Sequence, residues 1–188
     1  MVGRYVLLYM LLKFYSMYGK PLYGRKKIQK LLFLVEHFDL GSKRIVKSRG
    51  LTGYRFVVWS YGPFSKEIYE DLEKLVDEGY VEERVVGSDA TPEYEGIVLD
   101  LYTDDGFPKR MFIYEPRVRD PSRILGQLEK KLDHRVVTVI DGVLQEFGLK
   151  MPHELEDFVN GLLKLSPDKK VRYWGIDIDS YLDREGLA

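Results

Sequence analysis

Two demands that are hard to reconcile meet in residues 24–38 of this 188-residue chain: burial in a core and a high positive charge. On a helical wheel one stripe is apolar and consists of Ile28, Leu31, Leu32, Val35 and Phe38. The opposite side carries Lys26, Lys30, Phe33 and His37. A plain surface helix does not place a phenylalanine there, so either more protein covers this side or a partner docks on it. We expect Phe33 and His37 to be structural if buried, and to form a partner surface if exposed.

The composition is that of a folded protein with no bulk attraction to nucleic acid or anionic lipid. Apolar residues make up 45% of the chain, and the formal net charge is -1. The chain has no cysteine, which excludes disulfides and cysteine-ligated metals and agrees with a cytoplasmic location. Many Lys, Arg, Asp and Glu residues beside few Asn and Gln favour a thermophilic source. The apolar N-terminal run ends at Lys13, too early to span a bilayer, and predicts a buried helix and no membrane association.

The order of helix and strand signals predicts an α+β fold with two parts. Helices are expected at 2–18, 24–38 and from Ser65 to Gly79, with an insert and a strand at 54–59 between the last two. A β-ribbon of residues 80–86 and 97–102 follows, which completes the order of a winged helix-turn-helix. We therefore predict a winged-helix-like domain at 1–115.

An α-helical extension is expected at 116–188. It begins with one long helix from Asp120 to Phe147, followed by a helix from Pro152, a strand or docking segment at 173–176, and a short helix capped by Asp179. The long helix is apolar enough either to pack on the first domain or to form the seam of a homodimer.

Charge is sharply divided along the chain. Residues 20–55 hold ten basic and two acidic residues, a net +8, whereas residues 66–105 hold three basic and fourteen acidic residues, a net -11. An acidic third helix is a poor surface for a phosphate backbone, so standard winged-helix docking on DNA is disfavoured. If nucleic acid binds, the better candidate is a basic face made of Arg25, Lys26, Lys27, Lys30, Lys43, Arg44, Lys47 and Arg49. The alternative is that these residues neutralise the acidic block or form a solvated surface.

The residues offer little for catalysis. His37, His134 and His153 are far apart in sequence, and no P-loop, dinucleotide fingerprint or serine-nucleophile motif occurs. An acidic run at 177–185 lacks the glycine and the final glutamate of a calcium loop. We expect no catalytic residue, no metal and no cofactor. The turn Tyr61–Phe64 has aromatic residues on either side of Gly-Pro, and we favour a core-packing role over a binding role for it.

Three motifs carry a family resemblance. They are GRKKIQKLLFL at 24–34, YGPFSKEI at 61–68 and LVDEGYV at 75–81. In order and spacing they resemble the YwgA-like family of winged-helix-like prokaryotic proteins over about residues 1–106. They are more faintly similar to the Panacea domain of antitoxin-like proteins, which also pairs a lysine-glutamine-lysine-leucine helix with a glycine-proline turn. The first resemblance implies a fold, and the second implies toxin neutralisation or an adaptor role.

Together these features predict a non-enzymatic regulator. The leading hypothesis is a nucleic-acid-binding protein that uses the basic face of residues 20–55. The alternative is a protein-interaction module of antitoxin or adaptor type, which would bind its partner through the same basic residues or through a surface at Phe33 and His37.

Overall fold

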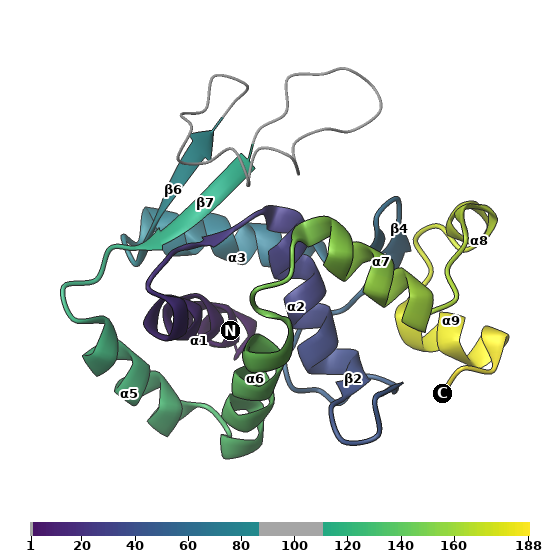
Figure 1. Ribbon diagram of the computed structural model, residues 1–188, viewed down its shortest axis with the longest axis horizontal. Coiled ribbons are helices and arrows are strands. Elements are labelled where there is room, and N and C mark those ends of the chain that lie inside the picture. The colour runs from purple at the N-terminus through teal and green to yellow at the C-terminus, as the bar shows by residue number, and fades with distance from the viewer. Residues whose placement is uncertain (1, 87–110) are drawn as a thin grey trace.

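Helix α2 (Arg25–His37) runs through the middle of the fold and is surrounded by other elements (Figure 1). The structure is a computed structural model that describes residues 2–86 and 111–188. The remaining elements, in chain order, are α1 (Val2–Tyr18), β1 (Leu22–Tyr23), β2 (Phe38–Asp39), β3 (Arg44–Ile45), β4 (Val57–Trp59), β5 (Gly62–Phe64), α3 (Lys66–Asp77), β6 (Val81–Val86), β7 (Met111–Pro116), α5 (Pro121–Lys131), α6 (His134–Phe147), α7 (Pro152–Leu162), α8 (Pro167–Arg172) and α9 (Ile178–Glu185).

The expected first helix is confirmed as α1, and its nearly uniform apolar surface is explained by its neighbours. It packs against α3, α5, α6 and β7, and nine of its seventeen residues are buried, among them the unbroken run from Val6 to Leu12. Within the described part of the chain, none of the helices combines the length and the apolarity needed to cross a membrane.

The sheets are small and antiparallel. β7 lies between β1 and β6 in the three-stranded sheet, and β4 pairs with β5 in a hairpin of residues 57–64. The α+β class is therefore confirmed. The winged-helix arrangement stays a prediction, because the expected ribbon strand at 97–102 lies outside the described residues; β6 pairs here with β7.

The prediction of one long helix from Asp120 to Phe147 is wrong. The chain breaks into α5 and α6 at Leu132, whose backbone is extended (φ -84°, ψ 152°). The side chain of Asp133 then accepts a hydrogen bond from the Arg135 amide and so caps α6. The break turns α6 away from the direction of α5 (Figure 1), so that α5 packs on α1 while α6 also reaches α2.

The end of the chain differs from expectation in one detail. Asp177 caps α9, by accepting from the amides of Asp179 and Ser180, whereas Asp179 is the second helical residue. The segment before it does dock: Val58 of β4 donates to the Ile176 carbonyl and accepts from the Gly175 amide.

The extension packs on the N-terminal part in one continuous hydrophobic core that runs from Val6 to Leu182. A cluster of aromatic rings joins the two parts at the end of α2. The ring of Phe38 lies 5.6 Å from Phe147 and 5.8 Å from Phe158, edge to face in both cases, and those two rings are 5.0 Å apart. Residues on both sides of position 115 thus stabilise each other.

This shared core predicts coupled stability across position 115. Phe38→Ala and Phe147→Ala should each lower the free energy of unfolding by about 3–5 kcal/mol. The double variant should lose roughly 0.5–1.5 kcal/mol less than the sum, because the two rings contact each other. Urea denaturation of the four proteins measures this coupling. Additive losses, or two separate unfolding transitions, would contradict a single core.

Candidate functional site

Helix α2 is buried along an unbroken run from Lys27 to His37. This run includes five polar side chains, each at most 2% exposed: Lys27, Gln29, Lys30, Glu36 and His37. A buried polar group without a hydrogen-bond partner is costly, so these side chains need partners within the fold. For four of them the partners belong to two loops, one at each end of the helix.

The first loop is the hairpin of β4 and β5, held by two consecutive residues of α2. Gln29 makes two hydrogen bonds to the backbone of Ser65: its Nε2 donates to the carbonyl (2.7 Å), and its Oε1 accepts from the amide (2.9 Å). Lys30 Nζ donates to the Pro63 carbonyl at 3.0 Å. The two sequence motifs, one on α2 and one in the turn, are thus two halves of one contact.

Gly62 lets the hairpin approach α2 and α7 closely. Its φ is +90°, which favours glycine, and a Cβ at this position would lie 2.2 Å from Asn160 Oδ1 and 3.3 Å from Lys30 Nζ. Asn160 Oδ1 is itself buried and accepts no hydrogen bond within the described residues. The buried nitrogen of Lys30 and a buried amide oxygen therefore both lie close to a bare glycine.

Aromatic side chains of the hairpin, of α3 and of the segment after α8 form one surface, which we call the aromatic face: Trp59, Tyr61, Phe64, Tyr69 and Trp174. The ring of Trp59 lies 4.2 Å from Trp174 and 5.6 Å from Phe64, and Phe64 lies 5.4 Å from Tyr69. The ammonium of Lys26 lies 4.2 Å from the centre of the Tyr61 ring. Trp59, Tyr61 and Trp174 are 37%, 46% and 47% exposed, so large apolar rings face solvent side by side.

The second loop, residues 46–56, wraps around the C-terminal end of α2, and we call it the strap. The buried carboxylate of Glu36 accepts hydrogen bonds from the backbone amides of Gly50, Leu51 and Thr52 and from the hydroxyls of Ser48 and Thr52. Burial alone would raise the pKa of Glu36, but the hydrogen bonds from Thr52, Ser48 and Gly50 outweigh it and lower the pKa. Glu36 is therefore a structural anion that fixes the strap.

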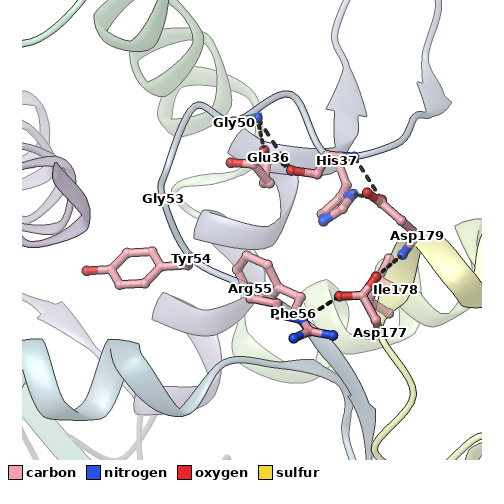
Figure 2. Close-up of a pocket in the computed structure, with 11 residues that line it drawn as sticks. Glu36, His37, Gly50, Gly53, Tyr54, Arg55, Phe56, Asp177, Ile178 and Asp179 are labelled. Atoms are coloured by element: carbon pink, nitrogen blue, oxygen red, sulfur yellow. Dashed lines mark hydrogen bonds and ion pairs between the residues drawn. The ribbon is translucent and has the colours of Figure 1, made fainter.

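A polar pocket of about 290 Å³ lies between the strap and the start of α9 (Figure 2). His37 forms part of its wall: Nδ1 lies 3.1 Å from the Val46 carbonyl and 3.7 Å from Asp179 Oδ1. Burial lowers the pKa of His37 below its usual value, although Val46, Asp179, Glu36 and Asp177 act in the opposite direction. Nearby, Arg55 Nε donates to Asp177 at 2.8 Å.

Phe33 and His37, the candidate partner surface, are both buried. Their rings stack at 4.8 Å, and Phe56 of the strap packs edge-on against both. By the criterion set from the sequence, Phe33 is structural. His37 is structural as well, but it also lines the pocket.

The basic residues predicted to form one face are divided between the interior and separate ion pairs. Lys27 and Lys30 are buried, and Arg49 Nη2 donates to the carbonyls of Val35 and Phe38 at the end of α2. Arg44 is exposed. The ion pairs of the others are Arg25–Glu83, Lys26–Glu156, Lys43–Glu146 and Lys47–Asp183. Three of these four acidic partners belong to the extension, not to the acidic block at 66–105 that the sequence suggested.

Within the described parts of the chain, no group of three or more His, Asp or Glu side chains is placed to hold a metal ion.

The aromatic face is the feature that sequence analysis undervalued. In the Tyr61–Phe64 turn, Gly62 and Pro63 are buried and Phe64 packs on Tyr69 of α3, as a core-packing role requires, whereas Tyr61 is exposed. Trp174 is far from the hairpin in sequence, so only the docking of the 173–176 segment reveals the face.

Comparison with protein families matches residues 28–162 to the antitoxin SocA-like family with the Panacea domain. The chain belongs to this family. The match covers well over half of the sequence and contains residues 28–34 of the α2 motif, with Gln29 and Lys30, and the whole turn motif that they contact. The YwgA-like family, which the sequence analysis favoured, is not shown. Neither the curated proteins nor the solved structures return a match.

The buried ammonium of Lys30 predicts a pH-dependent stability in this Panacea protein. Burial lowers the pKa of Lys30 to about 7 from an ordinary value of 10.5. Between these two values the unfolded chain holds the proton and the folded chain does not, so the stability of the wild type rises with pH in this window. Relative to Lys30→Met, the wild type should gain at most about 1.4 kcal/mol per pH unit between pH 7 and pH 10.

Urea denaturation at several pH values measures this difference. Gln29→Met is the matched control, since it removes hydrogen bonds to the same hairpin but no titratable group. The difference in the free energy of unfolding between Gln29→Met and the wild type should stay constant between pH 7 and pH 10. If the difference in the free energy of unfolding between Lys30→Met and the wild type is constant as well, the lowered pKa of Lys30 is contradicted.

Proposed function

We propose that this protein is an antitoxin-type interaction module that binds a partner protein through the aromatic face and acts without catalysis. Membership of the antitoxin SocA-like family supports a protein partner. The observation that carries the choice of surface is the close contact of Trp59 with Trp174, both exposed, on a hairpin that α2 holds through Gln29 and Lys30.

The physical case is that of a preorganised binding surface. Tryptophan and tyrosine contribute much of the binding energy at protein interfaces, because they bury a large area and lose little conformational freedom. Here the rings are already packed against one another, and the backbone beneath them is fixed by three hydrogen bonds with side chains of α2. Ordering of the hairpin therefore adds little to the cost of association.

The rim of the aromatic face carries charges of both signs. Lys26 lies against Tyr61 and pairs with Glu156, the exposed side chain of Lys66 pairs with Glu70, and Arg172 is exposed two residues before Trp174. We therefore infer that the partner offers apolar side chains for the rings, with charged residues of both signs around them.

The nucleic-acid hypothesis rested on one continuous basic face. Buried and ion-paired basic residues do not favour it, so the protein-partner alternative takes its place. A homodimer and a cytoplasmic location stay predictions from the sequence.

The test uses a partner that is first identified and then purified. The tagged protein is recovered from its source cells, the bound protein is identified by mass spectrometry, and the two purified proteins are titrated by calorimetry. Trp59→Ser combined with Trp174→Ser should weaken binding at least about thirtyfold, as expected for truncation of interface hot spots. If the partner arrests growth, co-expression of the wild type should restore it and the double variant should not.

Leu149→Ser provides the control, because Leu149 is 58% exposed but lies in the turn between α6 and α7. This variant should bind like the wild type. Equal binding by the double variant and the control would show that the aromatic face is not the interface. If none of the purified candidate partners binds the wild type, the proposed function itself is contradicted.

A further inference from the structure

Another pocket, which we call the three-helix pocket, is lined by residues of α1, of α5 and of the end of α3. Helix α1 packs against both of the other helices (Figure 1). The three-helix pocket has a volume of about 270 Å³ and shares no residue with the aromatic face. Drug-sized ligands occupy pockets of about 300–1,000 Å³, so this pocket suits a smaller molecule.

The inner lining of the three-helix pocket is apolar. It includes one leucine from each helix, each at most 5% exposed: Leu8, Leu75 and Leu128. Beside them lie the half-buried side chains of Ile124 and Tyr80. The backbone of Tyr80 is held at both ends, because its amide donates to the Leu75 carbonyl and its carbonyl accepts from the Arg117 amide, each at 3.0 Å. An apolar ligand that enters is therefore removed from water by a lining that is already in place.

The charged residues of the lining leave one cation without a counterion. Arg4 and Glu78 form an ion pair with each other and so connect α1 to the end of α3. The ammonium of Lys131, the last residue of α5, lies 3.7 Å from the centre of the Tyr5 ring. Within residues 2–86 and 111–188, Lys131 pairs with no carboxylate. The lining thus has a net charge of +1, and this charge lies at Lys131.

We propose that the three-helix pocket binds a small free monocarboxylic acid with an apolar body. Its carboxylate accepts a hydrogen bond from the ammonium of Lys131, and its body packs on Leu8, Leu75 and Leu128. The Tyr5 ring occupies one side of the ammonium and holds it at the pocket, while the other N–H donors stay available to the ligand. Lys131 and Arg4 would repel a cationic head group, and a neutral one would form a weaker hydrogen bond.

The test compares three probes that carry the same six-carbon chain: hexanoate, 1-hexanol and hexylammonium. The full-length protein is labelled with ¹³C in its leucine methyl groups and titrated with each probe by NMR. Hexanoate should shift the methyl resonances of Leu8, Leu75 and Leu128, whereas that of the exposed Leu149 stays in place. Hexanoate should bind at least about threefold more tightly than 1-hexanol, and hexylammonium more weakly than both.

Variants separate the charge from the apolar lining. Lys131→Gln keeps most of the stem but removes the charge, so hexanoate should lose its advantage over 1-hexanol while 1-hexanol binds as before. Ile124→Ser should weaken both probes at least about threefold, because it removes apolar contact area. Lys130→Gln is the matched control, since this neighbouring residue is exposed and lies outside the lining. It should bind all three probes like the wild type.

Two results would overturn the proposal. One is that hexanoate at millimolar concentration leaves the resonances of Leu8, Leu75 and Leu128 unshifted. The other is that 1-hexanol binds as tightly as hexanoate, or that Lys131→Gln keeps the preference for hexanoate, because the pocket would then not recognise the carboxylate through Lys131. Neither result bears on the aromatic face.

Discussion

Burial of α2 is the constraint on which the rest of this structure depends. A helix that passes through the middle of a small protein cannot leave its polar side chains in water, yet five of the residues from Lys27 to His37 are polar. Gln29, Lys30, Glu36 and His37 meet this requirement through hydrogen bonds to the backbone of two loops. The same bonds that satisfy the helix therefore fix the loops, since each missing partner would cost roughly 1–3 kcal/mol.

This arrangement gives each end of α2 one loop to position. Near its beginning, Gln29 and Lys30 hold the hairpin that carries the aromatic face. At its end, Glu36 holds the strap that encloses the pocket beside His37. The extension completes both the aromatic face and the pocket, because Trp174 packs against Trp59 of the hairpin and Asp179 lies across from His37. Neither site would be complete in residues 1–115 alone.

Secondary-structure elements and the fold class could be predicted from the sequence, whereas contacts between distant segments of the chain could not. Periodicity and end signals located α1, α2 and α3, because each forms from local preferences. The break at Leu132 was missed, since the apolar repeat continues through it and only packing on α1 and α2 reveals it. The charge of residues 20–55 was misleading for the same reason: burial of Lys30 and the pairing of Lys47 with Asp183 are tertiary facts. The pairing of the α2 and turn motifs was visible, but their hydrogen bonds were not.

Hydrogen exchange of the two loops tests the central claim most directly. In Gln29→Met, amides of residues 57–65 should exchange faster while those of the strap keep their wild-type rates. In Glu36→Gln the pattern should reverse, with faster exchange at residues 46–56 and an unchanged hairpin. Mass spectrometry of peptides from the two regions measures both. A uniform change over both loops, or unchanged rates in the loop that each side chain contacts, would contradict the account that buried polar residues of α2 position the two sites.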